Sequence, residues 1–196
     1  LQAMAAQGAQ VLDLEGMARH KGSMLGAWPG QPQPPQKQFE TQLYTALQRL
    51  DPSRPVYTES ESARIGSISL PLDMVAHLRA STDLVEIDAS PESRLDFLLR
   101  DYAYLGDDPA AFADLLGRFK QLQGNETITR WQAWAQEGNL PELFAELMSR
   151  HYDPQYSRSL GRNFSHWDKR HTVQADDLSD AGIARLAETV RGLFEG

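Results

Sequence analysis

The chain has 196 residues, of which 41% are apolar, and its formal net charge at pH 7 is −8. That length allows one sizeable core with a subdomain, the acidic balance argues against broad binding to nucleic-acid backbones, and the absence of cysteine excludes disulfides and thiolate metal ligands. No apolar run approaches the roughly 20 residues that a membrane span needs, and no secretory signal pattern begins the chain, so a cytoplasmic protein without a membrane partner is expected.

The first half of the chain alternates helices and strands. Apolar residues recur at helical spacing or in short β-prone runs, and Gly, Pro and Asp separate the segments. The pattern predicts helices at 1–7, 36–50 and 70–80 and strands at 9–14, 55–58 and 83–88. Residues 16–36, with four prolines, are expected to form a long binding loop or lid. Because long crossovers separate the strands, the sheet should be parallel, with helices on both faces.

The second half of the chain is mainly helical. Stripes of apolar residues predict several helices up to about residue 150, and Trp131 and Trp134 are expected in their core rather than in a ligand pocket. A short strand at 172–175 and a closing helix at 178–194 return to the α/β pattern. We therefore expect an α/β domain at 1–90 and 170–196, and a mainly helical subdomain or insertion at 91–169.

Charged and hydroxyl side chains follow the first two expected strands. After the first strand come Asp13, Glu15, Arg19, His20, Lys21, Gly22 and Ser23. After the second come Glu59, Glu61, Ser62 and Arg64. The carboxyl ends of neighbouring parallel strands build ligand sites, and cations, hydroxyls and backbone N–H groups beside glycine suit a phosphate. These residues predict one anion-binding cleft, and the alternative is a pair of solvated polar loops.

Individual roles within this cleft stay open. Glu59 ends an apolar strand, the position from which a carboxylate holds Mg²⁺ in phosphate-binding proteins, so Mg²⁺ at Glu59 is the one metal considered. His20 either carries a proton or contacts phosphate or the loop backbone. Arg64 either grips a phosphate or pairs with Glu61 across a turn. The histidines lack the spacing of a metal site, and no tightly bound cofactor is predicted.

Residues 150–171 differ in charge from the rest of the acidic chain. This stretch contains five lysine and arginine residues but only two aspartates, and four aromatic residues and three histidines are interleaved with them. Cations for phosphates and flat rings for unstacked bases serve single-stranded RNA recognition. The candidate RNA-binding residues are Arg150, Tyr156, Arg158, Arg162, Lys169 and Arg170. The alternative is a polar helical hairpin whose rings pack inward and whose cations pair with acidic neighbours.

Several segments, taken together and in order, resemble one protein family. They are Asp13-Leu14-Glu15-Gly16, Arg19-His20-Lys21-Gly22-Ser23 with Gly26, Gln33 with Gln36-Lys37-Gln38-Phe39-Glu40, Glu59 to Gly66, and Tyr152-Asp153-Pro154-Gln155-Tyr156. They resemble the C-terminal domain of tRNA 2-selenouridine synthase, from near Leu1 to at least Ser159. The resemblance implies an α/β fold with a P-loop-NTPase-like parallel sheet flanked by helices.

The resemblance also implies a transferase that modifies the wobble uridine of tRNA. The family attaches a geranyl group to the sulfur of 2-thiouridine and then replaces S-geranyl with selenium. Its cosubstrates, geranyl diphosphate and selenophosphate, are anions of the kind that the predicted cleft would attract. A rhodanese-like domain with a catalytic cysteine, and then a Walker A segment, come first in that family. This chain has neither a cysteine nor a Gly-x-x-x-x-Gly-Lys-Ser/Thr sequence.

We therefore expect a C-terminal fragment that lacks the first strand and the phosphate loop, is inactive alone, and has no identified catalytic residue. Two other functions remain compatible with the sequence. A nucleotide-dependent phosphotransferase of the P-loop type would need a Walker A segment upstream, and ATP hydrolysis by a longer chain would support it. A non-catalytic module that docks tRNA for a partner domain would bind tRNA without binding geranyl diphosphate or nucleotide.

Overall fold

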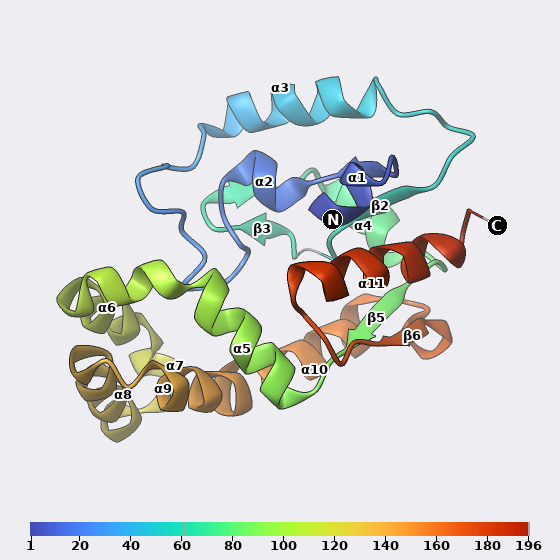
Figure 1. The fold of residues 1–196 in the computed structure, drawn as a ribbon. Helices are drawn as coiled ribbons and strands as arrows, with labels where there is room; N and C mark the ends of the chain where they lie inside the picture. The colour runs from blue at the N-terminus through green and yellow to red at the C-terminus, as the bar shows by residue number, and fades with distance from the viewer. Residues whose placement is uncertain (61, 196) are drawn as a thin grey trace. The chain divides into compact units, whose positions relative to one another are not determined.

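The structure, a computed structural model, describes residues 1–60 and 62–195 (Figure 1). The chain divides into two compact units. The first contains residues 1–86, 164–173 and those from 180 onward, and the second contains 87–163 and 174–179. The second unit is thus inserted into the first.

The first unit combines helices with short strands. Its helices are α1 (Gln2–Ala6), α2 (Leu14–Ala18), α3 (Gln36–Leu47), α4 (Leu72–Arg79) and α11 (Asp180–Gly192). Its strands are β1 (Gln10–Leu12), β2 (Val56–Thr58), β3 (Arg64–Ile65) and β4 (Ile68–Ser69), while β5 (Val85–Asp88) and β6 (His171–Gln174) each run from one unit into the other. The α/β class predicted from the sequence is confirmed.

The strands of the described residues pair in three two-stranded sheets rather than in one continuous sheet. β1 and β2 are parallel, with Gln10 opposite Val56 and Leu12 opposite Thr58. β5 pairs with β6. β3 and β4 form an antiparallel hairpin that the sequence did not predict, because strands of two residues are too short to show an alternating pattern.

Among the described residues of the first unit, apolar side chains form two clusters. The larger packs α2, α3, α4 and the β3–β4 hairpin through Leu12, Leu14, Ala18, Phe39, Leu43, Ile65, Ile68, Leu70 and Val75. The smaller packs α1 and α11 through Met4, Ala187 and Val190, with Val11, Tyr57, Val85 and Val173 from the strands against them. The segments that follow β1 and β2 therefore rest on a buried core.

One helix lies where the sequence predicted a loop. Residues 16–36 were expected to lack regular structure, yet α2 occupies Leu14–Ala18. Asp13 caps this helix, because its carboxylate accepts a hydrogen bond of 2.6 Å from the backbone N–H of Gly16. Glycine at position 16 leaves room for this cap, since a Cβ atom there would lie 2.5 Å from a carboxylate oxygen of Asp13 and would displace it. A helix of five residues shows too few apolar repeats to be recognised from periodicity.

The second unit is helical in the described residues. It contains α5 (Pro91–Asp101), α6 (Pro109–Leu116), α7 (Lys120–Gln123), α8 (Asn125–Glu137), α9 (Leu140–Leu147) and α10 (Asp153–Asn163), with a π-helical turn at Met148–Tyr152. Trp131 is fully buried and its ring packs edge-on against Phe119. The prediction that Trp131 belongs to the core is confirmed, whereas Trp134 is half-buried under the guanidinium of Arg130.

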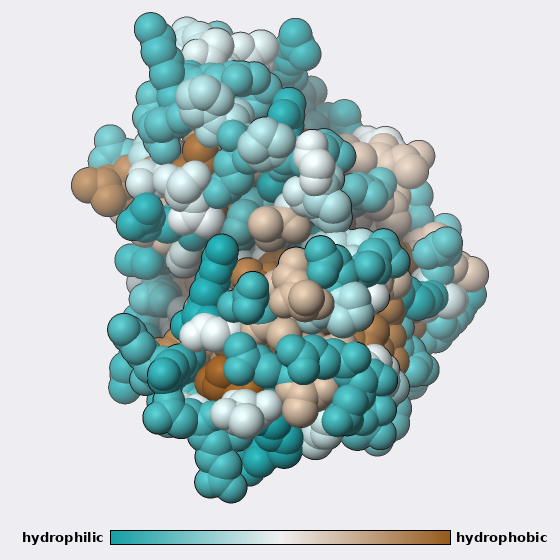
Figure 2. All heavy atoms as spheres, turned by 90° about the vertical axis from the view of Figure 1, so that its left-hand side faces the viewer, coloured by the Kyte–Doolittle hydropathy of each residue, from teal (hydrophilic) through white to brown (hydrophobic). Residues whose placement is uncertain are grey.

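On the face of the molecule in Figure 2, hydrophilic side chains predominate and apolar ones occur in small separate groups. Exposed apolar residues scattered in this way are normal for a folded protein. Within the described residues, the helices are too short or too polar to cross a bilayer.

Candidate functional site

The parallel pairing of β1 and β2 brings the segments after both strands together. Both backbone N–H groups at the start of α2 reach across to the second strand: Leu14 donates to one carboxylate oxygen of Glu59 at 3.0 Å, and Glu15 donates to the other at 3.3 Å. The Thr58 hydroxyl donates to the carbonyl oxygen of Leu12 at 2.8 Å. The prediction that the two strands end at one edge is confirmed. We call residues 13–26 and 59–69, apart from residue 61, the strand-end site.

Asp13 and Glu59 form a carboxyl pair in this site. Burial and, to a lesser extent, the neighbouring Asp13 carboxyl raise the pKa of Glu59 to about 7, although the backbone hydrogen bond from Leu14 acts in the opposite direction. A group with such a pKa carries a proton during part of its time at neutral pH. Perturbed carboxyls of this kind are common at functional sites and also occur in structural networks.

The backbone between Arg19 and Gly26 closes on itself. The N–H groups of Lys21, Ser23 and Gly26 donate to the carbonyl oxygens of Gly26, Lys21 and Ser23 at 2.8, 2.8 and 2.9 Å. A Cβ atom on Gly26 would lie 3.0 Å from backbone atoms of Lys21 and Ser23, so any side chain there would crowd the turn. The sequence predicted backbone N–H groups open to a phosphate, but these three are already used within the turn. These three N–H groups are therefore not available to an anion.

Gln33 joins the two halves of the strand-end site. Its amide nitrogen donates to the carbonyl oxygens of Ala18 at 3.2 Å and Ile65 at 2.9 Å. Its amide oxygen accepts hydrogen bonds from the N–H group of Ser67 at 2.8 Å and from the Ser67 hydroxyl at 2.9 Å. The end of α2 and the β3–β4 hairpin are thus tied by one side chain.

Gln36 makes a second bridge to the same hairpin. Its amide nitrogen donates to the carbonyl oxygen of Ser69 at 2.8 Å, and its amide oxygen accepts the Ser69 N–H at 2.9 Å. Sequence reasoning placed Gln33 and Gln36 in a family pattern without giving them a task. Their spacing at the start of a helix was the available signal, but the backbone partners of an amide cannot be read from spacing.

Arg19 and Arg64, which the sequence predicts to bind phosphate, are each adjacent in the chain to a residue that Gln33 bridges. Arg19 comes directly after Ala18 and has a left-handed backbone with φ of 51°, and Arg64 comes directly before Ile65 and is exposed. Neither arginine side chain makes an ion pair or hydrogen bond among the described residues. The Ser62 hydroxyl, in contrast, donates to the carbonyl oxygen of Arg64 at 2.6 Å and so belongs to the local turn.

The remaining predicted residues of the cleft have separate positions. His20 lies beside Gly66, burial lowers its pKa, and its Nδ1 atom is buried without a hydrogen-bond partner in the described part of the chain. Gly22 has φ of 66°, which explains glycine there. Glu61 lies outside the described residues.

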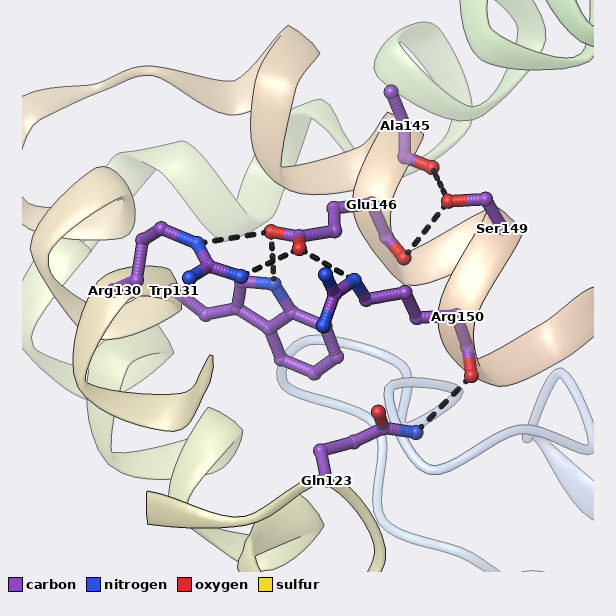
Figure 3. A network of polar contacts seen from close by, with 7 residues as sticks. All are labelled: Gln123, Arg130, Trp131, Ala145, Glu146, Ser149 and Arg150. Carbon is purple, nitrogen blue, oxygen red and sulfur yellow. Dashed lines mark hydrogen bonds and ion pairs between the residues drawn. The ribbon is translucent and has the colours of Figure 1, made fainter. Parts of the chain in front are cut away.

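Two of the candidate RNA-binding residues are engaged in ion pairs. Glu146 accepts hydrogen bonds from the buried indole of Trp131 at 3.0 Å and from Arg130, and Arg150 pairs with it at 2.7 Å (Figure 3). In the first unit, Arg170 pairs with Glu86 at 2.6 Å and lies over the ring of Trp167. These arginines match the alternative in which cations pair with acidic neighbours.

The other candidates are on exposed positions of both units. Tyr156, Arg158 and Arg162 lie on α10, where Tyr156 is 56% exposed. The Arg158 and Arg162 side chains make no ion pair within the described residues. Lys169 ends a 3₁₀ turn of the first unit, Trp167–Lys169. The predicted RNA-binding segment is therefore divided between the units.

Comparison with known proteins gives the family. A family model described as "tRNA 2-selenouridine synthase AAA domain" matches residues 2–126. The chain belongs to the tRNA 2-selenouridine synthase family. A protein of that name from Alcanivorax borkumensis is 31% identical over 179 residues, which cover 77% of this chain and 49% of the relative. One from Shewanella loihica is 31% identical over 181 residues, 78% of this chain and 48% of the relative.

A third relative, tRNA 2-selenouridine synthase of Nitrosomonas europaea, is 39% identical over 95 residues, 47% of this chain and 24% of its own length. The chain therefore spans about half the length of curated relatives, or less. No solved structure matches. The match to the tRNA 2-selenouridine synthase AAA domain contains the whole strand-end site and ends before the basic segment at 150–171.

Proposed function

We propose that this chain is the part of a tRNA 2-selenouridine synthase that binds the phosphate groups of its cosubstrates at the strand-end site. The main observation that supports this proposal is the Gln33 bridge, which joins the backbone beside Arg19 to the backbone beside Arg64. Two arginines that make no ion pair with any other described residue, on segments tied together by Gln33, suit a diphosphate, because a guanidinium donates two parallel hydrogen bonds to phosphate oxygens. The membership of the site in the family domain supports the proposal.

The proposed reaction has two steps on the wobble 2-thiouridine of tRNA. In the first, the sulfur attacks the C1 carbon of geranyl diphosphate, a C–S bond forms, a C–O bond breaks, and diphosphate leaves with the electron pair. In the second, the selenium of selenophosphate attacks C2 of the base, the C–S bond breaks and geranyl thiolate leaves, and water cleaves the Se–P bond to release phosphate. Cations beside the departing diphosphate would stabilise the charge that develops on it, which is how a protein assists such a transfer. Mg²⁺ near Glu59 would serve the same purpose.

The remaining chemistry is assigned to other parts of a longer enzyme. The chain contains no cysteine, so a thiol step must use a group from elsewhere. We assign it to a rhodanese-like domain, with a Walker A segment completing the phosphate site, and we expect this chain alone to leave 2-thiouridine unmodified. The tRNA itself would contact α10, where exposed Tyr156 offers a ring and Arg158 and Arg162 offer charge.

Calorimetry with geranyl diphosphate, with and without Mg²⁺, tests the assignment. Arg19→Ala and Arg64→Ala should each weaken binding about 10-fold or more, the usual effect of losing a charge-assisted hydrogen bond. The matched control is Arg49→Ala, which removes an exposed arginine just after the end of α3. Equal affinities for Arg19→Ala and Arg49→Ala would contradict the proposal. Tight tRNA binding without any binding of geranyl diphosphate would favour the docking module instead.

A further inference from the structure

Helix α2 is fixed at both ends by residues far away in the sequence. At its start, Glu59 accepts the N–H groups of Leu14 and Glu15, while Asp13 accepts the N–H group of Gly16. At its end, Gln33 donates to the carbonyl oxygen of Ala18. Three successive N–H groups are thus satisfied by two carboxyl groups, one of which comes from the other strand.

This short helix needs such support. A helix of five residues is unstable by itself, because nucleation fixes several backbone angles for very few hydrogen bonds. Both Glu59 oxygens are used as acceptors, and a carboxylate would repel a phosphate rather than bind it. Because both oxygens accept N–H groups of α2, Glu59 has a structural role in addition to any contact with Mg²⁺.

We propose that Glu59 is a positioning residue of the strand-end site, because its carboxylate fixes the start of α2 and with it the direction in which Arg19 leaves the end of the helix. This inference rests on the proposed function for its effect on ligand binding. Arg19 directly follows α2 and ends it with a left-handed backbone. A tilt of α2 at its start would therefore displace the Arg19 side chain from any ligand that it holds.

Two hypotheses, an electrostatic effect of Glu59 on a nearby anion and the positioning role, predict different results when Glu59 is replaced. Glu59→Gln removes a negative charge, so proximity alone predicts tighter anion binding. Glutamine has one acceptor oxygen, so one of the two N–H groups of α2 would lose its partner, and positioning predicts weaker binding. Glu59→Asp keeps the charge but is one methylene shorter and cannot reach both N–H groups as glutamate does. Proximity then predicts no change, while positioning again predicts weaker binding.

The experiment measures geranyl diphosphate affinity by calorimetry at pH 8.5 for the unmodified chain, Glu59→Gln and Glu59→Asp. Glu92→Gln, an exposed position on α5 of the second unit, is the matched charge control. We expect about 5-fold or greater weakening for both Glu59 variants and no change for Glu92→Gln. Unchanged or tighter binding by both Glu59 variants would overturn the proposal.

Amide hydrogen exchange separates this proposal from the proposed function. Faster exchange at Leu14, Glu15 and Arg19 in the Glu59 variants, with slow exchange in the core of α3 retained, supports the positioning role even if the unmodified chain binds no geranyl diphosphate. In that case the proposed ligand alone fails. Unchanged exchange at all three amides would refute the positioning role whatever the ligand affinity.

Discussion

The Glu59 carboxyl is affected by burial, by the neighbouring Asp13 carboxyl and by hydrogen bonds from two backbone N–H groups. Its folded-state pKa of about 7 lies well above the ordinary value of 4.5. Between these two values the folded chain binds more protons than the unfolded chain, so this group makes stability fall as pH rises from 4.5 to 7. Its contribution becomes constant above the folded-state pKa.

The direction of this pH dependence of stability can be measured by comparing two proteins. Urea unfolding of the unmodified chain and of Glu59→Gln from pH 4.5 to pH 8.5 should show the advantage of the unmodified chain shrinking as pH rises to about 7. Taking the difference cancels the opposite trend from His20 and His151, whose pKa values burial lowers. A difference that stays flat across this range would show that Glu59 has an ordinary pKa.

The same residues show how far the sequence could predict the site. Asp13 and Glu59 each follow a β-prone run, and parallel pairing of those runs brought them together as predicted. The role of Gln33 could not be predicted, because its four partners are atoms of Ala18, Ile65 and Ser67. These residues lie at the end of a five-residue helix and in a short hairpin, neither of which shows a sequence period. Individual hydrogen bonds depend on the folded backbone, which residue types alone do not specify.

At the scale of elements, one half-buried carboxylate links α8 to α9. Glu146 on α9 holds Arg130 and the indole of Trp131, both on α8 (Figure 3). Helical spacing predicted that Trp131 would be buried, but nothing in that spacing indicated which acid would satisfy its N–H group. Indole nitrogens that are buried usually find such a partner.

Glu146→Ala should destabilise the second unit by about 2–3 kcal/mol, because it leaves the buried Trp131 N–H unsatisfied and separates two arginines from their shared partner. Glu142→Ala, an exposed change on the same helix, should cost less than about 1 kcal/mol. Urea unfolding followed by tryptophan fluorescence measures both. Equal effects of the two substitutions would show that the Glu146 network adds no stability.

At the scale of the whole molecule, a net charge of −8 sets the conditions for RNA binding. A chain with this charge repels polyanions overall, so a tRNA contact would depend on local cations and weaken strongly with salt. Arg158 and Arg162 are the exposed cations on α10 that could supply such a contact.

Arg158→Ala and Arg162→Ala should each weaken tRNA binding and reduce the slope of log affinity against log salt by about 1, since each would remove one phosphate contact. Filter binding at several salt concentrations gives both quantities. Arg118→Ala, which removes an exposed arginine from the same unit, should leave the slope unchanged. A slope unaffected by Arg158 and Arg162 would remove α10 from the proposed RNA surface.

The insertion of the second unit into the first affects the order in which parts of the protein can fold during synthesis. Helices α5 to α10 are consecutive and can pack as they leave the ribosome, whereas the cluster under α1 needs Ala187 and Val190 from the last helix. The β1–β2 pair must therefore wait, with part of its apolar surface exposed, until α11 has been synthesised. Translation that stops before α11 would release a product with a formed helical unit and an unfinished α/β unit, a natural target for chaperones and proteases.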